Sequence, residues 1–448
     1  MTDDTSKGQA RPVPASRIAR LGRLSTMTAG VAGNMAARGL GQLGQGKRPT
    51  MRDLLLTPAN VRRVTDQLAQ MRGAAMKVGQ LVSMDTGDVL PAELTEIMAR
   101  LRSDAHFMPP AQLKKVLKAE WGEGWLRRFD KFDVRPIAAA SIGQVHRARL
   151  KDGTDLAIKV QYPGVARSID SDVSNVGALV RMSGLLPRGF DLAPYLEEAR
   201  KQLHEETDYL REARYLTQFR LLLAGDDRFG LPQVRDDLTT PDILSMTYVP
   251  GAPIEDVAEL PQETRDHVAR SLIDLLLREL FEFGVMQTDP NFANYRYDPE
   301  TGRIVLLDFG ATRQIDPGVV ALYSRLFSAG MAQDQGAYAD ILMELGVLAP
   351  DTDTAHRDQI LKMMEMGFAD LRGAPTYDFA ATDVPRQMQV KGMALAEDGF
   401  VPPPLPIDVL FLQRKFGGVF LLAAKLRARV PVAEMLQSYL TNRTDCVA

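Results

Sequence analysis

One stretch of the chain, Gly284 to Thr312 (GVMQTDPNFANYRYDPETGRIVLLDFGAT), constrains the fold more than any other. Tyr295–Tyr297 and Ile304–Leu307 are short strand-like runs, and the turn-forming residues between them predict a β-hairpin. Pairing these strands brings Asn294 close to Asp308, because cross-strand neighbours lie about 5 Å apart. The sequence therefore predicts two oxygen-bearing side chains together at one end of a hairpin.

Asp289 precedes Asn294 by five residues and is expected at the mouth of the same loop. Phosphoryl transfer from a magnesium nucleotide needs two oxygen ligands for the metal and one carboxylate facing the attacking group. We therefore predict Asn294 and Asp308 as ligands of Mg²⁺, and Asp289 as the catalytic carboxylate. Each motif is short and also occurs by chance, so the hypothesis depends on whether the other parts lie upstream in the right order.

The upstream region from Phe132 to Val160 reads as strand, small-residue loop, strand, turn and strand. A protein kinase places its phosphate-covering glycine loop and then its nucleotide lysine in this order. Lys159, at the end of Ala-Ile-Lys, fits the lysine. The loop residues expected against ATP are Ala138, Ala139, Ala140 and Ser141. Alanine has a Cβ and lacks glycine's access to positive φ, so we expect this loop to hold phosphates less freely.

A charged helical stretch from Asp191 to Ala224 follows, and a kinase needs one of its glutamates to pair with the lysine. Asp208 and Glu212 share a face at i,i+4 spacing, whereas Glu206 and Asp208 point apart in a regular helix. A solvated acidic face is the alternative interpretation. The strand that ends in Pro250-Gly251 fits an interlobe hinge, where backbone groups of Thr247 to Val249 would meet an adenine edge.

The charge of the chain is unevenly distributed. Thr5 to Arg52 contains nine Lys or Arg and no acid; subtracting nine from the net charge of −3 leaves −12 for the rest. A basic arm indicates a negatively charged partner, for which membrane lipid and nucleic acid are the candidates. The only cysteine, Cys446, excludes an intramolecular disulfide within the chain. The longest apolar run, Phe416 to Ala424, is far shorter than the roughly 20 residues that span a bilayer.

The N-terminal region divides into three parts. Residues 1–15 are polar and predicted to be disordered. Residues 16–50 carry small side chains at every fourth position and leading arginines, which favours contact with lipid or a partner helix; a poorly ordered Gly/Ala-rich extension is the alternative. In the helix predicted for Pro58–Met84, Lys77 and Gln80 share a face. Judged alone, Lys77 would be a solvated lysine.

Together these motifs resemble the UbiB-type (aarF-domain) atypical kinase-like family. The resemblance rests on Lys77-Val-Gly-Gln80, Pro136-Ile-Ala-Ala-Ala-Ser-Ile-Gly-Gln-Val-His146, Glu206-Thr-Asp208, Met286-Gln-Thr-Asp-Pro-Asn-Phe-Ala-Asn294 and Leu307-Asp-Phe-Gly310. The form of the fourth motif is similar to the coenzyme Q branch of the family.

The resemblance implies an α+β, bilobal, protein-kinase-like fold with a helical extension over the nucleotide cleft. The expected units are a helical extension at 51–130, a β-rich N-lobe at 131–250 and a helical C-lobe at 251–448. It also implies that Glu212 pairs with Lys159, and that Lys77 and Gln80 are regulatory residues, Lys77 lying near Glu206 and Asp208.

We therefore expect an ATP- and Mg²⁺-binding enzyme, an ATPase or atypical kinase, that supports ubiquinone biosynthesis from the cytoplasmic side of a membrane by peripheral attachment. The expected partners are ATP, an anionic lipid or quinone-lipid precursor, and ubiquinone-biosynthesis proteins, with a homodimer left open and nucleic acid excluded. A protein serine/threonine kinase and a nucleotide-gated, non-catalytic scaffold are the alternatives. The phosphoryl acceptor, whether water, lipid or protein, stays open.

Overall fold

The protein is described by a computed structural model that covers residues 68, 71–86, 107–183, 191–400, 403 and 405–444. The chain forms two compact units. The first comprises residues up to Arg214 together with Gln233–Tyr248, and the second comprises Tyr215–Pro232 and the chain from Val249 onward. The predicted disordered segment 1–15, the basic segment 16–50 and Cys446 lie outside the described residues.

The first unit is built on a five-stranded antiparallel sheet with the order β1-β3-β4-β6, in which β2 also pairs with β3. The strands are β1 (Phe129–Phe132), β2 (Ala138–Ala139), β3 (Gly143–Leu150), β4 (Asp155–Gln161) and β6 (Ile243–Thr247). Val234 adds one isolated antiparallel bridge to Met246 of β6.

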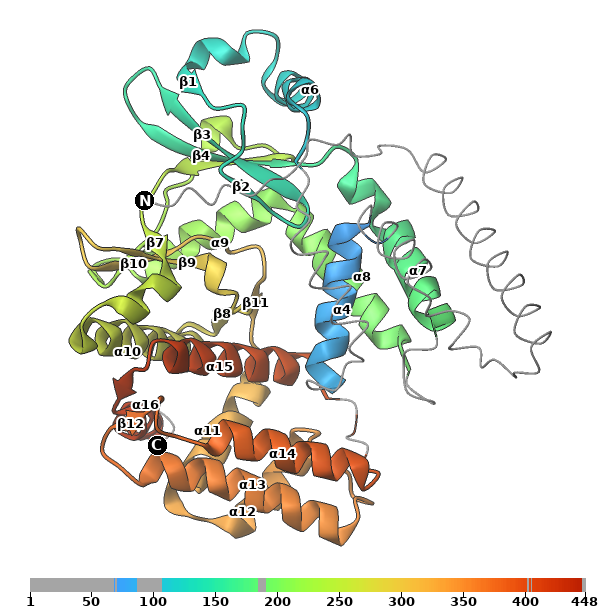
Figure 1. The fold of residues 1–448 in the computed structure, drawn as a ribbon, viewed down its shortest axis with the longest axis vertical. Helices are drawn as coiled ribbons and strands as arrows, with labels where there is room; N and C mark the ends of the chain where they lie inside the picture. The colour runs from blue at the N-terminus through green and yellow to red at the C-terminus, as the bar shows by residue number, and fades with distance from the viewer. Residues whose placement is uncertain are drawn as a thin grey trace, which may run out of the picture. The chain divides into compact units, whose positions relative to one another are not determined.

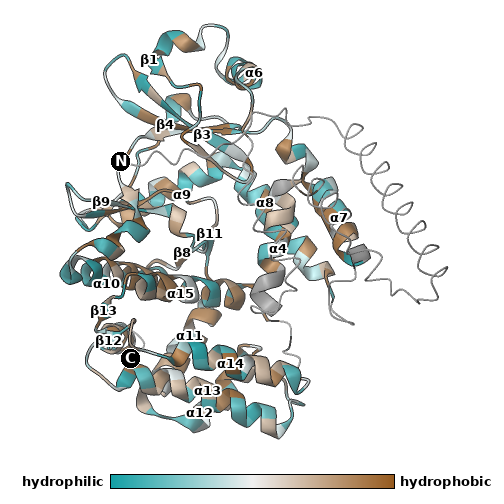
Figure 2. Ribbon diagram, viewed as in Figure 1, coloured by the Kyte–Doolittle hydropathy of each residue, from teal (hydrophilic) through white to brown (hydrophobic). Residues whose placement is uncertain are grey.

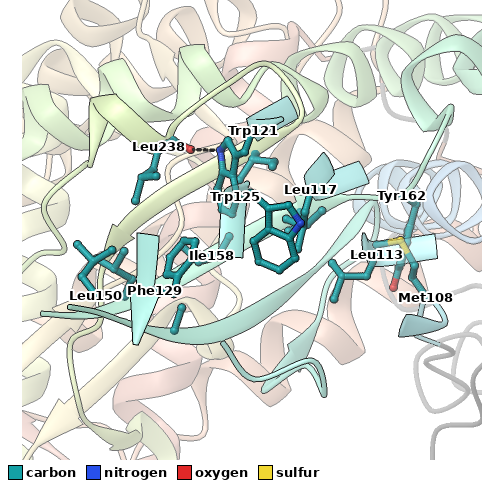
Figure 3. Packing of buried hydrophobic residues seen from close by; sticks show 14 residues of the cluster. Met108, Leu113, Leu117, Trp121, Trp125, Phe129, Leu150, Ile158, Tyr162 and Leu238 are labelled. Atoms are coloured by element: carbon teal, nitrogen blue, oxygen red, sulfur yellow. Dashed lines mark hydrogen bonds between the residues drawn. The ribbon is translucent and has the colours of Figure 1, made fainter. Parts of the chain in front are cut away.

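An aromatic and aliphatic cluster covers one face of this sheet (Figure 3). Helix α6 (Pro110–Trp121) and the 3₁₀ turn η1 (Trp125–Arg128) supply two tryptophans. The indole N–H of Trp121 donates to the carbonyl of Leu238 at 3.0 Å, so its polar atom is satisfied within the cluster. Leu156 and Ile158 of β4 are fully buried beneath these rings.

A buried polar chain crosses the same sheet. The backbone N–H of Met108 donates to Gln144 Oε1 (2.7 Å), and Gln144 Nε2 lies 2.8 Å from His146 Nε2. His146 Nδ1 lies 2.8 Å from the carbonyl oxygen of Asp133. This arrangement suits a neutral imidazole that carries its proton on Nδ1. Burial lowers the pKa of His146, and the bond to Asp133 opposes that effect.

Helices α4 (Arg72–Thr86), α7 (Val165–Ser183) and α8 (Ala193–Thr207) pack together in the first unit (Figure 1). Helix α9 (Tyr209–Leu222) follows α8 after a break at Asp208. The predicted helical stretch from Asp191 to Ala224 therefore consists of two helices. The break arises because the Asp208 carboxylate accepts the N–H of Arg211 (2.8 Å), which starts a new helix.

The second unit contains a four-stranded sheet with the order β5-β10-β9-β7 and a separate pair, β11-β8. These strands are β5 (Phe229–Gly230), β7 (Ala252–Pro253), β8 (Val285–Gln287), β9 (Tyr295–Asp298), β10 (Arg303–Leu306) and β11 (Thr312–Gln314). The predicted hairpin is confirmed by the antiparallel register of β9 and β10, in which Tyr295 faces Leu306.

Helices make up the rest of the second unit. They are α10 (Gln262–Arg278), α11 (Pro317–Ala332), α12 (Gln335–Glu344), α13 (Thr354–Arg372), α14 (Val384–Glu397), α15 (Ile407–Lys425) and α16 (Val432–Thr444). Hydrophobic and hydrophilic residues alternate around α10, α13 and α14, as expected for helices with one packed face (Figure 2). Within the described ranges, no helix is long and apolar enough to cross a membrane.

Candidate active site

The hairpin places the predicted metal ligands at one end of its two strands. The backbone N–H of Leu307 donates to the carbonyl of Asn294 at 3.1 Å, which extends the β9–β10 pairing by one step. Asn294 and Asp308 also line the same internal cavity of about 10 Å³. A cavity of this size is at the lower limit for holding one water molecule.

Asp289 lies in the loop between β8 and the short 3₁₀ turn η5 (Phe292–Asn294). Its Oδ2 accepts a hydrogen bond from Asn294 Nδ2 at 3.1 Å, and its backbone carbonyl accepts from Gln287 Nε2 at 2.9 Å. Asn291 starts the turn, because its side chain accepts the N–H of Ala293. The loop is thus held by side chains on both sides of Asp289.

Asp308 begins the Asp-Phe-Gly turn. Its Oδ1 accepts the N–H of Gly310 at 2.9 Å, which fixes the carboxylate against its own backbone. Phe309 is 1% exposed and packs on Phe219, with ring centroids 4.9 Å apart. Burial of this ring anchors the turn beside Asp308.

A buried charged cluster lies behind this loop, and the sequence analysis missed it. Lys415 of α15 is 2% exposed; its Nζ lies 3.3 Å from Glu279 Oε2, 3.2 Å from Gln287 Oε1 and 3.0 Å from the Tyr295 hydroxyl. Burial alone would lower the pKa of Lys415, but the charge of Glu279 and the bond to Tyr295 outweigh it and raise this pKa.

Glu279 begins a π-helical turn, η4 (Glu279–Phe283), at the end of α10, and its Oε1 accepts the N–H of Gln287 at 3.2 Å. The cluster therefore connects the residue before the loop, Gln287, to the residue after it, Tyr295. Neither of the adjacent basic residues of α15 is a solvated surface charge, since Lys415 is buried and Arg414 pairs with Asp289 at 2.8 Å.

In the first unit, the structure brings Lys159 and Glu212 together. The ammonium of Lys159 on β4 donates to both carboxylate oxygens of Glu212 on α9, each at 2.9 Å. The two side chains are 10% and 2% exposed. Both charges are largely shielded from water, so separating them would leave each one buried without compensation. The pair therefore holds the lysine in one position.

The alanine segment forms the short strand β2, in which Ala138 faces Val145 and Ala139 faces Gln144. Its tip closes tightly, since the N–H of Ala140 donates to the carbonyl of Gly143 at 2.8 Å. The alanines are exposed or half-buried. The expected loop is therefore a small hairpin rather than an open glycine-rich loop.

Lys77 of α4 forms an ion pair with Glu206 of α8, and the other oxygen of this carboxylate accepts from the Ser141 hydroxyl at 3.3 Å. A Cβ added at Gly73, one turn before Lys77, would meet Ile142 and the Ser141 carbonyl at about 3.4–3.5 Å. Helix α4 thus packs directly on the tip of the alanine hairpin.

The remaining predicted residues lie as follows. Gln80 lies three residues after Lys77 in α4 and is half-buried. Asp208 caps α9, and its Oδ2 lies 3.7 Å from Arg214 Nη2. Thr247 ends β6, and its hydroxyl accepts the N–H of Gln233 at 2.8 Å. Val249 is the first residue of the long C-terminal part of the second unit, Val249–Ala448.

Comparison with known proteins identifies a family to which this chain is similar. Residues 100–342 match the family model described as the ABC1 atypical kinase-like domain. A Saccharomyces cerevisiae protein named "Atypical kinase COQ8, mitochondrial" is 38% identical, over 97% of this chain and 86% of its own length. A Danio rerio protein named "Atypical kinase COQ8B, mitochondrial" is 36% identical, over 96% of this chain and 69% of its own.

Among solved structures, the complex of Rv3197 with erythromycin from Mycobacterium tuberculosis is similar in fold. Its TM-score is 0.58 at 23% identity, and the match covers 84% of this chain and 94% of that chain. With the family match, this likeness confirms the predicted α+β kinase-like fold.

Proposed function

Because the chain belongs to the ABC1 atypical kinase-like family, and thus to the UbiB-type proteins, we propose that it hydrolyses ATP at Asp289 in support of ubiquinone biosynthesis. Members of this family bind ATP and are ATP-dependent phosphoryl-transfer enzymes. The observation that carries the proposal is the buried Lys159–Glu212 pair, with both bonds at 2.9 Å. A kinase needs this pair to hold the nucleotide phosphates.

We assign the nucleotide contacts as follows. Lys159 binds the α- and β-phosphates, and Glu212 orients it. Backbone groups of Thr247 and Val249 bind the adenine edge, and Ala138, Ala139, Ala140 and Ser141 cover the phosphates. Because Ser141 and Gly73 tie the hairpin tip to α8 and α4, the hairpin is more rigid than a free glycine loop.

Asn294 and Asp308 fit the donor set that Mg²⁺ takes from a protein when phosphates supply its other ligands. The amide N–H group of Asn294 donates to Asp289, so the amide oxygen of Asn294 would be the atom that holds the metal. Within the part of the chain that the structure describes, no group of three or more His, Cys, Asp or Glu side chains could hold a metal ion. The bound ion would neutralise charge on the β- and γ-phosphates.

Asp289 is the catalytic carboxylate of this proposal. It accepts the proton of a water molecule whose oxygen forms a bond to the γ-phosphorus. The bond from this phosphorus to the β,γ-bridging oxygen breaks, its electron pair leaves with ADP, and the proton passes from Asp289 to solvent.

Water is favoured over a protein acceptor by the short segment after Asp-Phe-Gly. β11 starts at Thr312 and pairs with β8, and α11 already begins at Pro317. A protein kinase carries its activation loop and phosphorylation site in this part of the chain. Only six residues separate Gly310 from Pro317, which is too few for a peptide-docking loop.

We propose that Lys77, Gln80, Glu206 and Asp208 regulate turnover rather than perform it. Lys77 neutralises Glu206, which in turn holds Ser141 at the hairpin tip. Breaking the ion pair would release the tip and change how the hairpin covers the phosphates. Asp208 acts indirectly, by fixing the start of the helix that carries Glu212.

We further propose peripheral attachment to an anionic membrane from the cytoplasmic side. The support is the basic sequence between Thr5 and Arg52, which carries nine cations and no acid. The relatives named as COQ8 kinases direct the proposal toward a quinone-lipid precursor and other ubiquinone-biosynthesis proteins as partners. Assembly with a second copy of the chain is part of the same proposal.

The proposal is tested by Mg²⁺-dependent ATP hydrolysis of the purified full chain, with and without liposomes that contain an anionic lipid. We expect lipid-stimulated turnover that Asp308→Asn abolishes. Asp358→Asn, at an exposed position of α13, removes the same charge and serves as the matched control. Tight ATP binding with no turnover on any lipid would reject hydrolysis and favour the non-catalytic, nucleotide-gated scaffold.

A further inference from the structure

Helix α15 contacts the proposed catalytic loop and the residues that flank it at four places along its length. Lys415 binds Gln287, and Arg414 binds Asp289. A Cβ added at Gly418 would lie 2.3 Å from the Pro290 Cβ, so the helix backbone meets the loop without any space between them. Nearer the C-terminus of the helix, Lys425 Nζ lies 5.6 Å from the centre of the Phe292 ring.

Arg414 makes the contact that bears on chemistry. Its Nη2 donates to Asp289 Oδ1 at 2.8 Å, and the two side chains are 18% and 27% exposed. Asn294 Nδ2 donates to the other oxygen, Oδ2. Each oxygen of the carboxylate thus has its own donor, and the plane of the carboxylate is fixed by two groups from different elements.

Only one of these two donors carries a charge. Asn294 supplies a neutral amide and is also assigned to the metal. Arg414 supplies a full positive charge from a helix more than 120 residues later in the sequence. Both bonds are charge-assisted, because the carboxylate is ionised, but only the bond from Arg414 adds attraction between opposite charges. Arg414 therefore contributes more than Asn294 to the orientation of Asp289.

We propose that Arg414 is a positioning residue of the phosphoryl-transfer reaction, which holds the Asp289 carboxylate toward the attacking water. This inference rests on the proposed role of Asp289. Arg414 itself touches neither nucleotide nor metal in the proposal and acts through Asp289. The neighbouring Lys415 cluster fixes the backbone of the loop, whereas Arg414 fixes the side chain.

The test compares Arg414→Ala, Arg414→Lys and Lys391→Gln in the full chain, with steady-state ATP hydrolysis and separate measurement of the ATP dissociation constant. Lys391, on α14, is exposed, so its variant controls for the loss of one positive charge. Misplacing a catalytic group by about 1 Å can cost about 10²-fold in rate. We expect Arg414→Ala to lower kcat by about 10²-fold with an ATP dissociation constant within about threefold. Arg414→Lys should lower kcat less than Arg414→Ala does, because a lysine can keep one cationic contact with Asp289.

Two further measurements separate positioning from a purely structural role. Methylguanidine added to Arg414→Ala should restore part of kcat, since it can occupy the space and donate to Asp289. In the Asp289→Asn background, Arg414→Ala should have almost no further effect, because both act through one carboxylate.

The outcomes distinguish the two proposals. If Asp289→Asn leaves kcat unchanged, the proposed role of Asp289 fails and this inference fails with it. If Asp289→Asn abolishes turnover but Arg414→Ala changes kcat less than threefold, the inference alone is rejected. Additive losses in the double variant, or loss of ATP binding in Arg414→Ala without rescue by methylguanidine, would also reject it.

Discussion

The buried Lys415–Glu279 pair permits a quantitative prediction for the second unit. Lys415→Met removes the ammonium but keeps most of the side-chain volume, and it leaves Glu279 as an unpaired carboxylate that is 1% exposed. Removing one partner of a buried ion pair costs about 3–5 kcal/mol. Tyr295 and Gln287 lose a hydrogen-bond partner in addition. We expect the free energy of local unfolding around the loop to fall by about 3–5 kcal/mol.

Hydrogen–deuterium exchange of peptides that cover Val285–Asp298 measures this effect, because amide protection reports local opening. A loss of about 3–5 kcal/mol corresponds to exchange faster by about 10²–10⁴-fold. Both tryptophans, Trp121 and Trp125, lie in the first unit. Their fluorescence in urea therefore shows whether the first unit is still folded in the variant.

The double variant Lys415→Met/Glu279→Gln provides the control. Gln at position 279 removes the stranded charge but keeps an acceptor for the N–H of Gln287. We expect it to recover about half of the lost protection or more, because the unpaired charge is the larger part of the cost. A single variant whose exchange is less than tenfold faster, or a double variant less protected than the single one, would refute this account of the cluster.

Three further predictions follow from single contacts. Because the folded-state pKa of His146 is lowered, its contribution to stability is complete above the ordinary value near 6.5 and is lost as the pH falls below it. Urea unfolding of the first unit should be less pH-dependent between pH 7.5 and 5.5 in His146→Gln. Gly418→Ala should push α15 away from Pro290 and lower ATP turnover more than Gly417→Ala, whose Cβ would meet nothing. Trp121→Phe should cost about 1 kcal/mol of unfolding free energy in urea, because it removes the bond to Leu238.

The sequence was sufficient to predict the hairpin and to place Asn294 and Asp308 at one end of it, with Asp289 in the preceding loop. These residues lie within 20 positions of one another, so local turn chemistry and strand pairing decide where they go. Glu212 was harder to identify. Helical periodicity placed it on one face with Asp208, but the chain breaks at Asp208 and a new helix begins. Its assignment to Lys159 came from the resemblance to a family.

The contacts of α15 with the catalytic loop could not be predicted in this way, because they join residues 120 or more positions apart. A basic residue on a helix is usually solvated, and periodicity shows which side chains share a face but not how deeply that face is buried. Judged from the sequence alone, Arg414 therefore belongs to the solvated face of a basic amphipathic helix. Its partner Asp289 was already assigned to catalysis, and nothing in the sequence joined the two.

Lys415 did leave a signal that a stricter interpretation would have used. It occupies a row with Phe411, Val419 and Leu422, at positions i, i+4, i+8 and i+11 of α15, and all four are buried. Glu279 continues a similar row after Leu272 and Leu276 of α10. A charge within such an apolar row is expensive unless an opposite charge meets it. Two opposite charges, each within the buried row of its own helix, therefore predict both an ion pair and the packing of α10 against α15. Successive helical side chains point about 100° apart, so the same argument excludes Arg414 from that row and directs it to the adjacent face, where Gly418 meets the catalytic loop.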